Sequence, residues 1–395
     1  MLQSKVPIGV FAAGVTSLAA LWLSRPKPYP PRDWSEEAQK FPDHIRLGLG
    51  PFFYYCEEKG ASTPVDRVTE KMRQKGIEDL DMVHMMKPGL DTNSDGFVLT
   101  SRKSVDRVKD KLREIAVKYS KRSFDMNKWD TELLSLTRAL SKESPVRVSM
   151  RLNMGEDFNS VVSFEDRRKT ESIVCDILAS TVGGSYHPLC GNKSREHVGV
   201  QSMTSGMLDV LRSQELMFEA PWTTFDLSAG LGRHWPDARG VWLVESQDDY
   251  QIVVWVNHED HIEIVGISDD GVGLTKKMET MRQEIASKLP SIARSDEFGY
   301  LSVKPEYSGT GLTVAKTVRL DRLASHPRFS QLTKCLGLQV TDLGNRNYQL
   351  VSTERFGVTL EEATARAVAA FRVVSNLDTF PDASEMIERL LAKVS

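Results

Sequence analysis

The stretch Trp255-Val-Asn-His-Glu-Asp-His261 decides how this chain is interpreted, because it places two carboxylates, Glu259 and Asp260, between two imidazoles. It begins in the alternating segment Gln251 to Val256, which predicts a β-strand that ends at the carboxylates. The two histidines are three residues apart and could be metal ligands, but a strand-to-turn segment leaves their geometry undefined. No third ligand clusters with them in the sequence, so we predict no metal site.

Working outward, strand patterns dominate from about Pro145 onward. Residues 146–152 (VRVSMRL) alternate with a period of two, and further strands are predicted in 240–244, 262–267 and 314–320. Helices intervene, and the clearest has an apolar stripe made by Leu274, Met278, Met281, Ile285 and Leu289, ended by Pro290. Closing helices are predicted at 361–374 and 383–394. Strands with helices on one side indicate an α+β domain with a mostly antiparallel sheet.

The segment from about Trp34 to Met126 is mainly helical in pattern. Residues 65–75 and 104–119 both show apolar side chains at helical spacing among charges. In the second, Val105, Val108, Leu112, Ile115 and Val117 form roughly one stripe. We therefore predict a small α-helical domain at 45–126 in front of a larger domain at 127–395.

The N-terminus departs from this globular pattern. Residues 6–23 form a run of 18 residues without a charged side chain. A helix of that length spans roughly 27 Å, which is enough to cross the core of a bilayer. Four prolines in residues 25–33 predict a stiff, extended spacer, so 24–44 is assigned as a linker. We predict a retained single-pass transmembrane anchor at 6–23 that contacts membrane lipid; the alternative is a cleaved targeting peptide.

Composition narrows the functional classes. The net charge of −3 argues against a general nucleic-acid binder, and no basic run with interleaved aromatics is present. The four cysteines lack CxxC spacing, which argues against a zinc site or a disulfide framework and favours thiols in a reducing compartment.

Two further motifs are better explained as turns. Residues 91–96 (DTNSDG) match the first half of a calcium-binding EF-hand loop, but position 12 is Arg102 instead of a bidentate glutamate, so we predict a polar turn. The glycine-rich run Ser308 to Leu312 lacks the spacing of a phosphate-binding P-loop and also predicts a turn.

Four segments in the right order resemble the phosphagen kinases, the creatine and arginine kinase family. Residues 255–261 are similar to WVNEEDH, 235–242 (WPDARGVW) to WPDARGIW, 299–312 to GY…CPSNLGTGL and 348–357 (YQLVSTERFG) to FDISNLDRLG. The resemblance implies a small helical domain followed by a larger antiparallel sheet flanked by helices, the fold shared by phosphagen kinases and glutamine synthetase catalytic domains. It also implies that Glu259 would orient the guanidine that attacks ATP.

The same resemblance implies a cage of arginines around the ATP phosphates, because planar guanidinium groups fit phosphate oxygens. Arg147 matches the first cage arginine, whereas Ser149 stands where the second is expected. Arg151 is out of register but shares a strand face with Arg147, so Arg147 and Arg151 are the candidate ATP-phosphate ligands. At the third and fourth cage positions the chain has Glu263 and Thr313.

Three more family positions are altered. Thr317 replaces a histidine, and Lys304 replaces the reactive cysteine, where a lysine would repel a guanidinium substrate. The mobile loop that carries the fifth arginine is several residues shorter here, between Gln339 and Tyr348, and lacks its motif. Losing three or four charged hydrogen bonds of about 1.5–3 kcal/mol each would remove ordinary turnover.

We therefore predict a catalytically inactive phosphagen kinase-like protein with a vestigial Glu259. The expectation is a membrane-anchored accessory subunit of a mitochondrial complex, in which the inner membrane is favoured over the outer, a respiratory complex is one candidate, and homo- or hetero-dimers are plausible. No cofactor is predicted. Two alternatives stay open: a divergent guanidino kinase acting on arginine or creatine with ATP and magnesium, and a sensor that binds ATP without transferring phosphate.

Overall fold

The structure is a computed structural model, and it describes most of the chain from residue 80 onward. The described ranges are 80–92, 94–120, 145–155, 157–189, 203–220, 223–245, 250–380 and 383–394. The predicted anchor at 6–23, the linker at 24–44 and the predicted helix at 65–75 lie outside these ranges. Within them, no helix combines the length and apolar character that crossing a bilayer requires.

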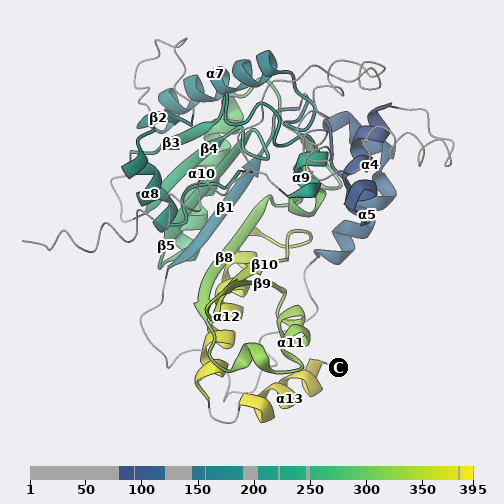
Figure 1. Cartoon of the computed structure of the whole chain (residues 1–395), viewed down its shortest axis with the longest axis vertical. Coiled ribbons are helices and arrows are strands. Elements are labelled where there is room, and N and C mark those ends of the chain that lie inside the picture. The colour runs from purple at the N-terminus through teal and green to yellow at the C-terminus, as the bar shows by residue number, and fades with distance from the viewer. Residues whose placement is uncertain are drawn as a thin grey trace, which may run out of the picture.

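An eight-stranded sheet forms the centre of the molecule, and every strand pair in it is antiparallel (Figure 1). In spatial order the strands are β2 (Ser185–Pro188), β3 (Gly240–Leu243), β4 (Gln251–Val256), β5 (Ile262–Ser268), β1 (Val146–Leu152), β8 (Leu312–Arg319), β10 (Asn347–Ser352) and β9 (Leu338–Gly344). A separate two-stranded hairpin joins β6 (Arg294–Ser295) to β7 (Gly299–Tyr300). The predicted α+β class and antiparallel sheet are confirmed.

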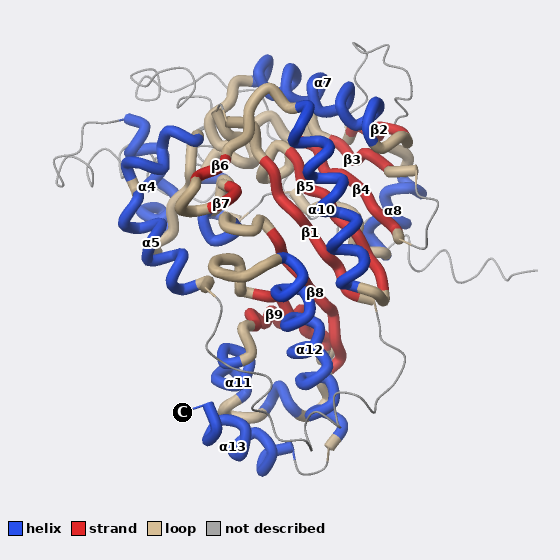
Figure 2. Tube along the Cα trace, turned by 180° about the vertical axis from the view of Figure 1, so that it is seen from behind, coloured by secondary structure: helices blue, strands red, loops and turns tan. Residues whose placement is uncertain are grey.

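Helices cover one face of this sheet. The described helices are α4 (Leu80–Thr92), α5 (Lys109–Lys118), α7 (Phe164–Thr181), α8 (Ser205–Ser213), α9 (Thr224–Ser228), α10 (Gly271–Lys288), α11 (Phe329–Cys335), α12 (Leu360–Thr379) and α13 (Ala383–Val394), with short 3₁₀ turns at Arg102–Arg107, Pro305–Tyr307 and Leu323–Ser325. Figure 2 shows α10 lying over β1 and β5 and α12 running alongside β8. The opposite face is covered only in part, by α8 near β3 and β4.

The helix-covered face is the main core, and simple alternation builds it. Val148 and Met150 of β1 are fully buried and belong to one cluster with Met278 and Ile285 of α10. The apolar stripe predicted for α10 is therefore part of the main core. Because successive strand residues point to opposite faces, Arg147, Ser149 and Arg151 must point away from α10.

A second core ties the N-terminal helices to the rest of the chain. Val105, Val108 and Leu112 are buried together with Phe158, Phe298 and neighbouring apolar residues. Val117 was predicted to belong to the same stripe, and this is wrong: it is 78% exposed. Within α5, Val117 follows Leu112 by five residues, which is about 140° around an α-helix, so it points away from this core. Tyr119, seven residues after Leu112, contacts the core instead.

The predicted polar turn at 91–96 is also partly wrong. Asp91 lies in the last turn of α4, where its carboxylate accepts hydrogen bonds from Lys87 (3.0 Å) and from the hydroxyl of Ser228 in α9 (2.6 Å). Among the described residues of this segment, Ser94 and Asp95 are bends. Asp91 therefore joins α4 to α9 through a buried ion pair.

Candidate active site

The face of the sheet opposite α10 gathers the candidate site residues. On β1, Arg151 lies opposite Glu263 of β5, and Ser149 lies opposite Thr313 of β8. Sheet pairing therefore brings three of the altered positions and one candidate phosphate ligand onto the same surface. Arg147 lies at the other end of this row, half-buried, opposite Ile267 and Ala315.

Glu259 lies in the tight connection between β4 and β5. Asn257 begins this turn with a positive φ of 56°, and its side-chain amide donates to the carbonyls of Arg167 and Ala238, both at 2.9 Å. Asparagine tolerates the left-handed conformation better than most residues, so the turn chemistry suits the sequence. The turn thereby fixes the position of the following two carboxylates.

The chain itself supplies two cations to Glu259. The Lys304 ammonium donates to Glu259 Oε1 at 2.7 Å, and Arg151 Nη1 donates to Glu259 Oε2 at 2.9 Å. The Glu259 side chain is only 13% exposed. Burial would raise the pKa of Glu259, but Lys304 and Arg151 outweigh it and hold the pKa far below its usual range. The carboxylate that would orient a substrate guanidine is thus ionised and already paired.

Lys304 is shared between two carboxylates. Its ammonium lies 2.7 Å from Glu259 and 2.7 Å from Asp226 of α9. Burial alone would lower the pKa of Lys304, but both carboxylates outweigh it and raise the pKa well above its usual value. The ammonium therefore remains charged and takes the place of a cationic partner for Glu259.

Arg151 is the second centre of this network. Its guanidinium contacts Glu259, Asp260 at 3.2 Å and Glu263 at 3.5 Å, and it stacks on the Tyr307 ring at 4.1 Å. Burial would lower the pKa of Arg151, but the three carboxylates raise it well above the usual value. We predicted Arg151 as a weak phosphate ligand; in this structure it is engaged by carboxylates instead.

Asp260 is an internal anchor. It is completely buried and accepts hydrogen bonds from the amide of Asn153, the hydroxyl of Ser302 (2.7 Å) and the backbone N–H of Val303 (2.8 Å), besides Arg151. These donors come from the end of β1 and from the segment that leads to Lys304. Asp260 thus holds together the elements that position the network, and it has no exposed surface for a substrate.

The remaining altered positions make contacts of their own. Thr313 is buried, and its hydroxyl accepts a 3.3 Å hydrogen bond from Arg355. The hydroxyl of Thr317 donates to Glu215 at 2.8 Å. Glu263 pairs with Arg151 and lies 3.7 Å from His258. Burial would raise the pKa of Glu263, but Arg151 outweighs it, so the carboxylate stays charged.

The shortened loop after Gln339 is a closed hairpin. β9 and β10 are joined by Asn345 and Arg346 alone, with φ angles of 53° and 64°, the geometry of a two-residue type I′ turn. Arg346 at its tip pairs with Asp321 at 3.0 Å, away from Glu259. A tight hairpin therefore replaces the mobile loop expected from the family.

The two histidines of the opening stretch have separate roles. His261 is buried, and its Nδ1 accepts a hydrogen bond from the backbone N–H of Met154 at 3.2 Å. Burial, and next the Arg167 charge, lower the pKa of His261 to about 3, so it is neutral. His258 instead stacks on Phe218. In the described part of the chain no three His, Cys, Asp or Glu side chains gather in a way that could hold a metal ion.

Sequence reasoning missed three members of the site: Asp226, Tyr307 and Arg355. Asp226 pairs with Lys304 but lies 78 positions earlier in the chain (304 − 226), and no motif marks it. Tyr307 lies between Arg151 and Arg355, whose guanidinium centre is 5.0 Å from the ring. Arg355 lies inside a family-like segment, so the signal was present, but its contact with Thr313 depends on the fold.

Comparison with known proteins agrees with this fold. Residues 184–366 match the ATP:guanido phosphotransferase C-terminal catalytic domain. Creatine kinase M-type of Gallus gallus is 25% identical over 246 residues, which cover 57% of this chain and 60% of the relative. The Oryctolagus cuniculus enzyme is 31% identical over 193 residues, 45% of this chain and 46% of the relative. The chain thus spans only about half of the length of these curated relatives.

Solved structures show the same fold over more of the chain. A lombricine kinase structure superposes with a TM-score of 0.59 at 19% identity, covering 91% of this chain and 98% of that one. The substrate-free duplicated taurocyamine kinase from Schistosoma mansoni gives 0.58 at 20% identity, covering 75% and 43%. The architecture is that of a phosphagen kinase. The chain resembles creatine kinase in sequence over part of its length, and it shares its fold with lombricine and taurocyamine kinases over most of it.

Proposed function

We propose that this chain has kept the phosphagen kinase fold but no longer transfers phosphate to guanidines. The observation that carries the proposal is the pairing of Glu259 with Lys304 and Arg151, at 2.7 and 2.9 Å. A guanidinium substrate would have to displace the Lys304 ammonium, which is held by two carboxylates and repels a second cation at that place.

The phosphate side of the site supports the same proposal. Phosphoryl transfer depends on positive charge arranged around the phosphates. Ser149 and Thr313 offer hydroxyl groups where charge is needed, and Glu263 adds a buried negative charge beside Arg151. The carboxylates already neutralise Arg151, which leaves the half-buried Arg147 as the candidate ligand with no carboxylate paired to it within the described residues.

Binding of MgATP is the direct test of the nucleotide side. We expect millimolar MgATP to change the melting temperature by less than about 1 °C. A ligand at 100 times its dissociation constant would add about 2.7 kcal/mol of stability, which corresponds to a shift of several degrees. A creatine kinase treated in parallel is the positive control. A shift of several degrees would instead support the ATP sensor.

We further propose that the protein acts as an anchored accessory subunit of a mitochondrial membrane complex, with the inner membrane favoured. The support is sequence-based: the uncharged residues 6–23, their basic flanks and the proline-rich linker. A chain that keeps the kinase fold but has lost phosphotransfer would act through its surface, and a subunit that binds other proteins acts in this way.

Deleting residues 6–23 should move the protein from the membrane pellet to the supernatant, because the deletion removes the only long apolar run of the chain. The measurement is fractionation of mitochondria, followed by purification of the full chain in mild detergent, where partner subunits should copurify in fixed stoichiometry. A full chain that purifies alone would count against the subunit role. A mature protein that lacks residues 6–23 by mass spectrometry would contradict the anchor.

A further inference from the structure

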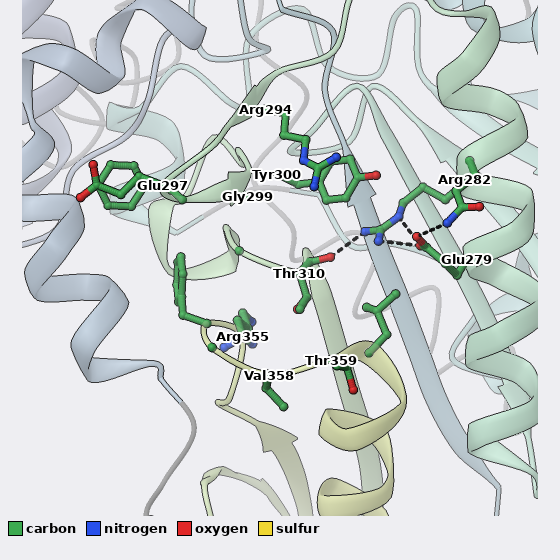
Figure 3. A pocket seen from close by; sticks show the side chains of 16 residues that line it. Glu279, Arg282, Arg294, Glu297, Gly299, Tyr300, Thr310, Arg355, Val358 and Thr359 are labelled. Carbon is green, nitrogen blue, oxygen red and sulfur yellow. Dashed lines mark hydrogen bonds and ion pairs between the residues drawn. The ribbon is translucent and has the colours of Figure 1, made fainter.

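A pocket of about 610 Å³ opens beside α10 and the start of α12 (Figure 3). Its walls are α10, the β6–β7 hairpin, the turn that precedes β8 and the start of α12. Three arginines line it: Arg282 of α10, Arg294 of β6, and Arg355 of the segment between β10 and α12. Arg355 is shared with the site described above, where it bonds to Thr313 and lies over the Tyr307 ring. The ion-paired residues Glu259, Lys304 and Arg151 do not line the pocket.

Ion pairs within and around the pocket already neutralise its two acidic side chains. Glu279 pairs with Arg282 of the same helix at 2.6 Å, and Arg282 is held further by the Thr310 carbonyl. Glu297 pairs with Lys109 at 3.0 Å and with Arg113 at 2.7 Å, both on α5. The pocket lining therefore carries a net positive charge, which comes from Arg294 and Arg355.

Arg355 is a buried cation without a salt bridge in the described part of the chain. It is 3% exposed, and its hydrogen bonds go to the carbonyls of Ser352 and Thr353 and to the Thr313 hydroxyl. Its Nε has no hydrogen-bond partner among the described residues. The Glu306 carboxyl acts on it through space, but burial raises the pKa of Glu306 and weakens it as a counter-ion. A buried charge of this kind favours an anion beside it.

The start of α12 adds further donors to the same wall. The Thr359 side chain caps the backbone N–H of Glu362 at 3.2 Å, which leaves the earlier N–H groups of this 20-residue helix at the pocket. Gly357 just before it has a φ of 65°, and a Cβ there would meet no atom within 4 Å. The backbone is thus open to a ligand at the positive end of a helix dipole.

We propose that this pocket binds the phosphate group of a small phosphorylated compound, between Arg294, Arg355 and the start of α12. Arginine forks, a helix N-terminus and an open glycine are the elements that hold phosphate in proteins. The pocket volume exceeds what inorganic phosphate needs, so an organic portion of the ligand would lie along α10 and Tyr300.

Isothermal titration of the full chain with inorganic phosphate, at ionic strength held constant with chloride, tests the proposal. We expect saturable 1:1 binding that Arg294→Ala weakens at least tenfold, because a charged hydrogen bond contributes about one factor of ten or more. Arg389→Ala removes an arginine on α13 that is also exposed, and it should leave binding unchanged. Arg294 is exposed, so its removal should not disturb folding.

A second pair of variants separates charge from shape. Gly357→Asp places a carboxylate at the pocket and should abolish binding, whereas Gly357→Asn has the same size and tolerance of positive φ and should retain it within about threefold. No binding at millimolar phosphate, or binding that ignores both Arg294→Ala and Gly357→Asp, would overturn the proposal. This outcome is independent of phosphotransfer, because these variants leave Glu259 and Lys304 untouched.

Discussion

Replacing Arg151 with methionine should lower the free energy of unfolding by about 3–5 kcal/mol at pH 7. Arg151 is the cation that Glu259, Asp260 and Glu263 share, and its side chain is 9% exposed. Methionine keeps much of the volume against Tyr307 but leaves three carboxylates in a buried site with Lys304 as their remaining strong cation. Urea denaturation of both proteins at pH 7 measures the difference.

The pH dependence of this difference provides an internal check. In the wild type the pKa values of Glu259 and Glu263 are depressed, so their contribution to stability is present above the unfolded pKa of about 4.5 and is lost as the pH falls below it. In Arg151→Met, burial dominates at Glu263, and this carboxyl should take up a proton above pH 4.5. Lowering the pH from 7 to 5 should therefore reduce the difference in the free energy of unfolding between the wild type and Arg151→Met.

Arg319→Met is the matched control. Arg319 also pairs with a carboxylate, Asp321 at 3.1 Å, but its side chain is 65% exposed. Water and salt screen an exposed pair, so it contributes little to stability and this variant should unfold close to the wild type at every pH. A loss below about 1 kcal/mol for Arg151→Met would mean that the carboxylates do not depend on this arginine, and the description of the network would be wrong.

The parts of the fold that sequence predicts are those governed by local periodicity. β1 alternates because its valine and methionine side chains pack against α10 while its polar side chains point the other way, and α10 shows its stripe because it lies on the apolar face. β4 is buried on both faces, between the main core and the cluster that includes Leu211 of α8. The position where the family-like mobile loop is shortened could also be located, since the missing residues can be counted. Val117 is the opposite case: it was assigned to the predicted stripe, but its position five residues after Leu112 in α5 points it into solvent.

The sequence predicts which residues belong to the site, but it does not predict which of them contact one another. Sequence predicted that Lys304 repels a guanidinium; it did not predict that the ammonium bonds to Glu259 and Asp226. Such pairings depend on how α9 packs against the sheet, and no periodicity carries that information. Arg151 was likewise predicted to be a phosphate ligand because it shares a strand face with Arg147. The pairing of β1 with β5 places Glu263 directly opposite Arg151. One residue of register thus decides between an anion site and an ion pair.

Phosphotransfer from MgATP to arginine, creatine, taurocyamine or lombricine should be roughly 10³–10⁶ times slower than in a creatine kinase measured side by side. Three phosphate contacts of about 1.5–3 kcal/mol are absent at Ser149, Glu263 and Thr313, and each 1.4 kcal/mol is a factor of ten in rate. The closed turn at Asn345 and Arg346 removes a fourth contributor. Phosphoguanidine formation, followed by ³¹P NMR over hours, is sensitive enough to detect a residual rate.

Glu259→Gln distinguishes residual catalysis from contamination. Any rate that belongs to this chain should fall further in Glu259→Gln, whereas a contaminating kinase would leave the same rate in both preparations. Lys304→Cys removes the ammonium from Glu259, yet we expect it to remain inactive, because the phosphate side of the site is still occupied by Glu263 and the hydroxyl groups. Turnover within about a hundredfold of creatine kinase that Glu259→Gln abolishes would make the chain a guanidino kinase. In that case Lys304 would have to leave Glu259 when the substrate binds.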